Sequence, residues 1–274
     1  MDRLLEGKVA IITGSGRGIG RAAAGLLAQH GARIVVSDID GGPAEEAAAA
    51  IRANGGHAVS VPGDITDKAF PSLLVDTAVK QLGGLDIIVN NAGYTWDAVI
   101  HKMSDEQWEA ILAVHLTAPF RLIRAASGYL REAAKQEKAA TGEARPRKIV
   151  NVSSTSGTRG NAGQANYSSG KAGILGLTKT LAKEWGQFNI QVNAVAFGRI
   201  DTRLTQPKEK DEKIRRGENE IAIGIPSERL ERTTPLIPLG RPGTPQEAAG
   251  AIFFFASPLS DYISGQTLEV TGGL

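Results

Sequence analysis

The sequence predicts one α/β domain, built as a doubly wound parallel sheet with helices on both faces. Short runs of β-branched residues alternate with longer, alanine-rich segments along the whole chain, which is the pattern of βαβ units. The predicted strands are almost continuously apolar, as expected of strands that helices cover on both faces. A chain of 274 residues is long for one domain, but α/β sheets of this size often form a single unit, so we expect one domain over 1–274.

Seven strands are predicted in order, with a helix-permitting segment between each and the next. They are expected at residues 8–13, 32–37, 57–62, 85–90, 148–153, 190–196 and 267–270.

Two stretches break this alternation. The stretch 131–148 is polar and charged, and we interpret it as a solvated helix end followed by a surface loop. The stretch 203–232 follows the sixth strand and is either a plain surface insertion or a lid. A loop that leaves the carboxyl end of a strand stands over the ligand crevice of such a sheet, which favours the lid.

Composition excludes several classes of protein. The 31 basic and 29 acidic residues leave a formal charge of +2, too even for a protein that binds nucleic acid by neutralising phosphates. Cysteine is absent, which excludes disulfides and thiolate sites and fits a reducing cytoplasm. The four histidines lack close metal-ligand spacing, so we expect no metal. No signal peptide or membrane span is expected. We therefore expect a soluble, cytoplasmic protein.

A glycine-rich turn after the first strand predicts a dinucleotide site. The segment TGSGRGIG at 13–20 lets the backbone approach a pyrophosphate, whose charge the N-terminal N–H groups of a helix then meet. Its glycines Gly14, Gly18 and Gly20 depart from the GxGxxG spacing, and alone they also fit a plain strand-to-helix turn. Asp38 ends the second strand, where a carboxylate accepts hydrogen bonds from an adenosine ribose. Together the two signals predict a bound dinucleotide.

Asp38 also predicts which dinucleotide is bound. A carboxylate at the ribose repels a 2′-phosphate and bonds well to free hydroxyls, so NAD is favoured over NADP. Arg17, inside the glycine turn, is the opposing observation, because an arginine there is able to meet the added phosphate.

The catalytic chemistry is predicted from residues after the fifth strand. Ser153 and Ser154 come first, and Tyr167 and Lys171 follow at a spacing of four, which places them on one helix face. A phenol with a pKa near about 10 is a poor base at neutral pH, but the ammonium of Lys171 favours the phenolate. Ser154 is placed to polarise the substrate oxygen. Alone, this Tyr/Lys pair also fits an accidental surface pair.

Four motifs together resemble the short-chain dehydrogenase/reductase family over essentially the whole chain. They are TGSGRGIG, NNAG at 90–93, the serine pair thirteen residues ahead of YxxxK, and VNAVAFGRIDT at 192–202. The resemblance is greatest to the 3-oxoacyl-[acyl-carrier-protein] reductase and sugar or polyol dehydrogenase branches.

The resemblance implies a Rossmann-type seven-stranded sheet, a homotetramer, and metal-free hydride transfer between nicotinamide and a ketone or secondary alcohol, small or acyl-linked. It implies Tyr167 as general acid/base, with Ser154 and Lys171 as its catalytic partners. It also places Asp64 and Ile65 at the adenine, Asn91 and Gly93 near the ribose, and Thr202 near the nicotinamide carboxamide. The full predicted cofactor-binding set is Gly14, Ser15, Gly16, Arg17, Gly18, Ile19, Gly20, Asp38, Ile39, Asp64, Ile65, Asn91, Ala92, Gly93, Tyr167, Lys171, Gly198, Ile200 and Thr202.

Two positions depart from the family pattern. His115 stands where the family usually has a catalytic asparagine, and Phe197-Gly198 replaces the usual Pro-Gly after the sixth strand. His115 either takes part in a proton relay behind Lys171 or is a half-buried structural residue. The substitution leaves open a rival function, a catalytically weak dinucleotide-binding protein that acts as a regulator or oligomeric partner.

Overall fold

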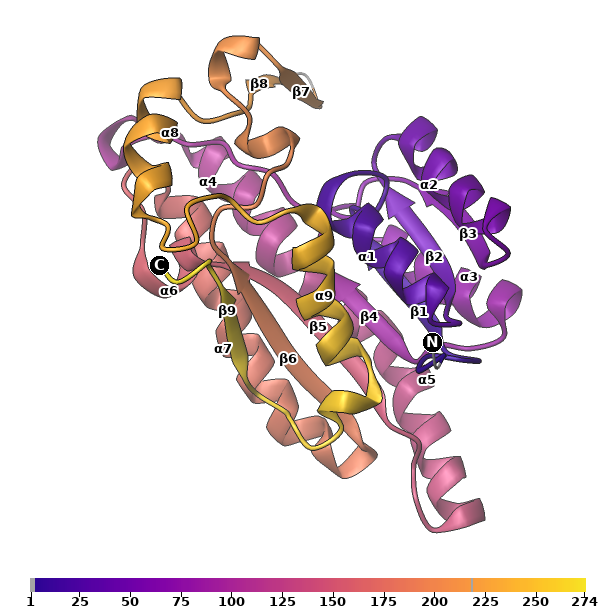
Figure 1. Ribbon diagram of the computed structural model, residues 1–274. Helices are drawn as coiled ribbons and strands as arrows, with labels where there is room; N and C mark the ends of the chain where they lie inside the picture. Colours follow the sequence, from indigo (N-terminus) through magenta and orange to yellow (C-terminus); the bar gives the residue numbers. More distant parts are fainter. Residues whose placement is uncertain (1–2, 218) are drawn as a thin grey trace.

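The computed structural model describes residues 3–217 and 219–274; residue 218, which falls in the predicted lid, and the first two residues of the predicted domain lie outside them (Figure 1). A seven-stranded parallel sheet forms the centre, in the order β3-β2-β1-β4-β5-β6-β9. Its strands are β1 (Val9–Thr13), β2 (Arg33–Asp38), β3 (His57–Pro62), β4 (Ile87–Asn90), β5 (Arg147–Ser154), β6 (Ile190–Phe197) and β9 (Thr267–Val270). Each predicted strand is confirmed to within two residues.

Helices cover both faces of the sheet, which confirms the doubly wound Rossmann-type domain. The α-helices are α1 (Gly18–Gln29), α2 (Gly41–Ala53), α3 (Phe70–Leu82), α4 (Asp105–Leu112), α5 (Ala118–Thr141), α6 (Thr155–Arg159), α7 (Ala165–Trp185), α8 (Ser227–Thr233) and α9 (Pro245–Ala256). A π-helix, η2 (Ala113–Thr117), joins α4 to α5. Short 3₁₀ turns are η1 (Ile100–Lys102), η3 (Gly186–Phe188), η4 (Arg203–Thr205), η5 (Lys208–Lys210), η6 (Thr234–Leu236) and η7 (Pro258–Ser260).

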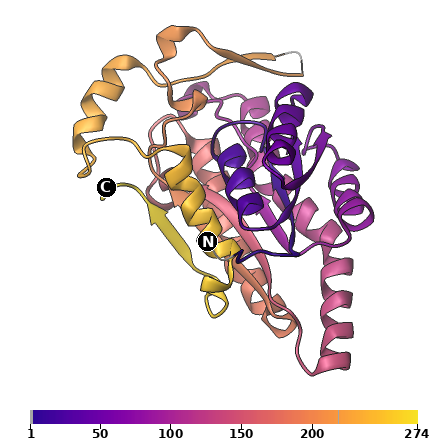
Figure 2. The same ribbon diagram turned by 45° about the vertical axis from the view of Figure 1, so that its right-hand side comes forward.

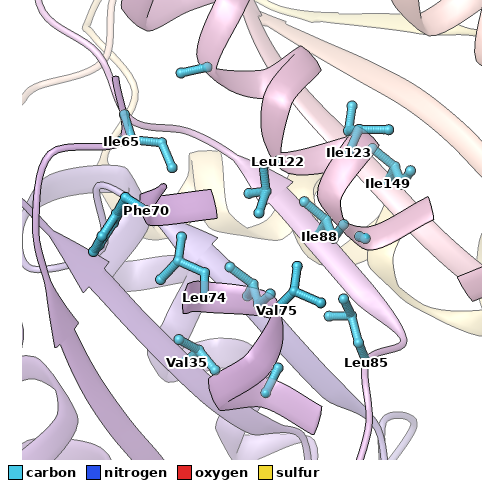
Figure 3. Packing of buried hydrophobic residues seen from close by; sticks show 14 of the residues in the cluster. Val35, Ile65, Phe70, Leu74, Val75, Leu85, Ile88, Leu122, Ile123 and Ile149 are labelled. Atoms are coloured by element: carbon cyan, nitrogen blue, oxygen red, sulfur yellow. The ribbon is translucent and has the colours of Figure 1, made fainter. Parts of the chain in front are cut away.

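Alternate residues of each strand supply two separate cores, because successive side chains of a strand point to opposite faces. Ile11 packs on the face covered by α3 and α5, with Leu74 and Leu122. Figure 3 shows part of this cluster, in which side chains from α3 and α5 meet those of the sheet. Ile12 packs on the opposite face with Leu27 of α1, among residues of α2 and α9.

The strand order places a ligand crevice at the carboxyl edge of the sheet. The order reverses between β1 and β4, and ligands of open α/β sheets bind outside the carboxyl ends of the strands at such a point. Asp38, Asn90, Ser154 and Phe197 are the last residues of β2, β4, β5 and β6. The fold therefore brings residues from distant parts of the sequence to one edge.

The stretch 203–232 contains structure that the sequence analysis did not predict. It forms an antiparallel hairpin of β7 (Lys213–Arg216) and β8 (Asn219–Ala222), followed by α8. Ile214 of β7 and Ile221 of β8 are buried. Figures 1 and 2 show this stretch, in orange, beyond the carboxyl edge of the sheet.

The charged stretch 131–148 is largely as predicted, since α5 runs to Thr141 and a loop follows. Its last two residues are an exception, because β5 already begins at Arg147 and both side chains are buried. Arg147 lies 2.7 Å from Glu137 in an ion pair, which compensates its burial. None of the helices among the described residues is both long and apolar enough to cross a membrane.

Candidate active site

A cavity of about 910 Å³ opens at the carboxyl edge of the sheet. Its lining extends from Asp38 at the end of β2, past Tyr167 on α7, to Arg229 on α8. The glycine turn and the predicted catalytic residues are thus parts of one cavity, although they are far apart in the sequence.

Most of the predicted site residues line this cavity. They are Gly14, Arg17, Gly18, Ile19, Asp38, Ile39, Asp64, Ile65, Asn91, Ala92, Gly93, His115, Ser154, Tyr167, Lys171, Gly198, Ile200 and Thr202. Three predicted cofactor residues, Ser15, Gly16 and Gly20, are not in the lining.

Those three residues belong to the glycine turn itself and act through contacts within the protein. The Ser15 hydroxyl donates to the Ile12 carbonyl at 2.6 Å and is fully buried. A Cβ on Gly20 would lie 2.2 Å from the carbonyl oxygen of Gly14, so only glycine fits where α1 crosses the turn. The Asn91 amide donates to the same Gly14 carbonyl at 3.0 Å. The NNAG segment and the glycine turn are therefore fixed against each other.

Asp38 is held in place at the dinucleotide end. Its Oδ2 accepts from the Gly16 N–H at 2.9 Å, and its Oδ1 accepts from the Asp40 N–H at 3.2 Å. The Arg17 guanidinium forms an ion pair with Asp40. The charge of Arg17 is therefore already balanced by a carboxylate of the protein.

The predicted catalytic residues meet where β5 and α7 face each other. Ser154 is the last residue of β5, not a loop residue after it, and its Oγ accepts from the Ser156 N–H at 3.1 Å. Tyr167 lies in the first turn of α7, and Lys171 lies one turn later. The buried Lys171 ammonium donates to the Val152 carbonyl at 2.6 Å and lies 5.7 Å from the centre of the Tyr167 ring.

Burial shifts the pKa values of both Tyr167 and Lys171. It raises the pKa of Tyr167 to about 12, while the Ser154 hydroxyl lowers this pKa and the charge of Asp97 raises it. Burial also lowers the pKa of Lys171 to about 7. The expected lowering of the phenol pKa by Lys171 stays a prediction, because burial is the dominant influence on both groups here.

His115 lies beside these residues in the π-helix η2. Such helices occur mostly as single turns inside α-helices, often at functional sites. Its Nε2 lies 2.8 Å from the Tyr94 carbonyl, and its ring meets the Tyr167 ring edge-on at 4.9 Å. A Cβ on Gly93 would lie 2.1 Å from the imidazole, so the ring packs directly on the NNAG segment.

The His115 ring is neutral near pH 7. Burial and the nearby charge of Lys171 lower its pKa well below the ordinary value, and the hydrogen bond to the Tyr94 carbonyl opposes them. A neutral ring that bonds a carbonyl through Nε2 carries its proton there. The Nδ1 atom is then an acceptor, buried without a hydrogen-bond partner.

Phe197-Gly198, the second departure from the family pattern, also lies at the cavity. Phe197 is buried, and Gly198 donates from its N–H to the Val270 carbonyl at 2.9 Å. The aromatic side chain lines the cavity at the end of β6.

One polar wall was missed by the sequence analysis. Gln164 donates to Asp97 at 2.8 Å, and Arg229 donates to Asn161 at 2.6 Å. These residues and Arg199 line the cavity, and the charge of Asp97 acts on Tyr167. No motif marks them, because their common feature is a position in space. Over the described ranges, no group of three or more His, Asp or Glu residues is arranged to hold a metal ion.

Comparison with known proteins agrees with this geometry. The sequence model of the short chain dehydrogenase family matches residues 8–213. Proteins named 3-oxoacyl-[acyl-carrier-protein] reductase are similar over nearly the full length. That of Vibrio cholerae is 38% identical and that of Thermotoga maritima 37%, each with 98% of both chains covered. That of Escherichia coli is 36% identical with the same coverage.

The predicted resemblance is therefore confirmed, and the alternative of a catalytically weak dinucleotide-binding regulator or oligomeric partner is not favoured. This chain belongs to the short-chain dehydrogenase/reductase family of oxidoreductases.

Proposed function

We propose that this chain transfers hydride between NAD(H) and a ketone or secondary alcohol, with 3-oxoacyl thioesters as the substrate class. The observation that carries the proposal is that Ser154, Tyr167 and Lys171 share one cavity with Asp38 and the glycine turn. The similar proteins are named 3-oxoacyl-[acyl-carrier-protein] reductases, which supports a 3-oxoacyl group in the substrate.

The dinucleotide fits the residues at the end of β1 and β2. Gly14 and Gly18 of the turn line the cavity without a side chain, and α1 begins at Gly18, so in this proposal the first N–H groups of α1 meet the pyrophosphate. In this proposal Asp38 accepts from the ribose hydroxyls, and Asn91 and Thr202 lie along the rest of the cofactor. The bound cofactor supplies or accepts the hydride.

The proton step falls to Tyr167. During reduction, its phenol donates the proton to the substrate oxygen, and the Ser154 hydroxyl holds that oxygen. The ammonium of Lys171 then stabilises the phenolate that remains. During oxidation of an alcohol, the same groups work in reverse.

Asp38 is expected to set the preference for NAD(H). The wild type should have a higher kcat/KM with NADH than with NADPH, since the carboxylate repels a 2′-phosphate and Arg17 is paired with Asp40. Replacement of Asp38 by alanine should lower the ratio of kcat/KM with NADH to kcat/KM with NADPH by about tenfold, as measured with both cofactors at limiting concentration. A wild type that is faster with NADPH would contradict this assignment.

His115 is expected to support the proton step. His115→Ala should lower kcat by about tenfold or more, because it removes the contact with Tyr167 and the Nδ1 acceptor. His115→Asn should keep substantial activity, since its amide is able to donate to Tyr94, and should shift the acidic limb of the pH–rate profile. If His115→Ala matches the wild type in rate and pH profile, the residue is only structural.

Absorbance of the reduced nicotinamide tests the proposed function. The purified chain is mixed with NADH and a panel of ketones that includes 3-oxoacyl thioesters, and with NAD and the matching alcohols. Turnover of a 3-oxoacyl thioester supports the proposal. Tight cofactor binding without turnover of any substrate would favour the regulatory protein instead.

We also infer a cytoplasmic homotetramer in which 203–232 acts as a lid. Large apolar side chains such as Leu259 and Tyr262 are exposed in the segment that joins α9 to the edge strand β9, and Phe120 is exposed on α5. Such surfaces and an unpaired strand edge are suited to association with further copies. Residues of the lid, among them Arg203 and Ile225, line the cavity.

A further inference from the structure

Several cations of the cavity wall form no ion pair with a carboxylate among the described residues. Arg199, Lys208 and Arg229 line this wall. No ion pair within 4.0 Å joins any of the three to an acidic residue in the part of the chain that the structure describes. Arg203 and Arg159, which also line the cavity, do have such partners, Glu212 and Glu269.

Arg199 is the most constrained of the three. It follows Gly198 directly after β6, and its guanidinium donates to the Thr234 hydroxyl. Its Nε is buried without a hydrogen-bond partner. Burying part of a cation without a counter-charge costs free energy on folding. We therefore expect the counter-charge of Arg199 to come from a bound anion.

Arg229 approaches the same wall from α8. It donates to Asn161 on the opposite side, and its own carbonyl accepts from the Thr233 hydroxyl at 2.7 Å. Thr234, the partner of Arg199, follows directly. Arg199 is therefore held at the end of the same helix that carries Arg229.

Two acids among the described residues act on these cations, Asp97 on Arg229 and Lys208 and the exposed Glu209 on Lys208. Partial burial raises the pKa of Asp97, while Gln164, Arg229 and Lys208 lower it. Even with Asp97 and Glu209 both ionised, the three cations Arg199, Lys208 and Arg229 outnumber these two carboxylates. The excess is positive, and a guanidinium suits carboxylate and phosphate oxygens in particular.

We propose that Arg199 and Arg229, with Lys208 beside them, form a subsite that binds an oxyanion of the substrate, either a carboxylate or a phosphate. The proposal rests on the proposed function, because it places this anion in the same cavity as the reacting carbonyl. It predicts that the protein prefers anionic ketones over neutral ones of similar size.

Three ketones distinguish the sources of the anion: ethyl acetoacetate is neutral, acetoacetate carries a carboxylate, and acetoacetyl-coenzyme A carries phosphates. The double variant Arg199→Gln, Arg229→Gln should lower the kcat/KM ratio of one anionic ketone to the neutral ketone by about tenfold or more, mainly through KM. A fall in the ratio for acetoacetate identifies a carboxylate as the bound anion, and a fall in the ratio for acetoacetyl-coenzyme A identifies a phosphate. Lys213→Gln is the matched control, since Lys213 lies in the same stretch but pairs with Glu220, and its ratios should not change.

A binding measurement separates this proposal from the proposed function. The NADH-bound protein is titrated with butyrate and with coenzyme A. At least one of the two should bind, and its dissociation constant should be about tenfold higher in the double variant. Binding of this kind without turnover of any ketone would sustain the subsite and refute the proposed function. Turnover with ratios that are unchanged in the double variant, or that fall equally in Lys213→Gln, would overturn the subsite and leave the proposed function standing.

Discussion

Replacement of Tyr167 by phenylalanine is expected to lower kcat by at least about a hundredfold and to leave NADH binding nearly intact. The change removes only the titrating oxygen, and loss of a general acid/base typically costs 10²–10⁴-fold. The ring keeps its edge contact with His115, so the wall of the cavity is preserved. Steady-state kinetics and NADH titration measure the two quantities separately.

Tyr129→Phe is the matched control for this prediction. Tyr129 lies on α5 outside the cavity lining, so its loss of a hydroxyl should leave kcat unchanged. A Tyr167→Phe enzyme that keeps most of its turnover would refute Tyr167 as the acid/base.

Replacement of Lys171 by methionine is expected to lower kcat by at least about a hundredfold as well. The ammonium lies 5.7 Å from the centre of the Tyr167 ring, and a buried charge stabilises a developing phenolate strongly. Methionine has a similar length and no charge. Nearly unchanged turnover would show that Tyr167 is activated without this charge.

The same variant tests the pKa of Lys171 through stability. Burial lowers this pKa to about 7 from the ordinary 10.5. Between these two pH values, the unfolded chain holds a proton that the folded chain has lost, so wild-type stability rises with pH. As the pH rises from 7 to 10.5, the free energy of unfolding of the wild type should increase relative to that of Lys171→Met. The increase should be about 1.4 kcal/mol for each unit by which folding lowers the pKa. A difference in unfolding free energy that stays flat from pH 7 to pH 10.5 would contradict this.

The sheet was predictable because its signals are local. Each strand is a short run of β-branched residues, and the turn at Gly14 and the pair Tyr167 and Lys171 have fixed spacings. Since parallel strands end at one edge, these local signals were enough to place the dinucleotide end and the catalytic end together.

The substrate wall was not predictable in the same way. Arg199 and Arg229 are ordinary charged residues in sequence, and only the fold of 203–232 brings them to one cavity. The hairpin of β7 and β8 was missed because its strands are only four residues long, with three charged residues in β7 and one buried isoleucine in each strand. The buried Arg147 was missed because no local pattern marks its pairing with Glu137, which lies on α5 across the intervening loop.

Transfer of an isotope label tests hydride transfer most directly. NADH that carries deuterium at the transferable position of the nicotinamide is incubated with the protein and acetoacetyl-coenzyme A, and the product is analysed by mass spectrometry. The proposed function predicts one deuterium at C3 of the 3-hydroxyacyl product for each NADH oxidised. NADH that binds tightly but passes no deuterium to this ketone, or to any other ketone of the panel, would contradict it.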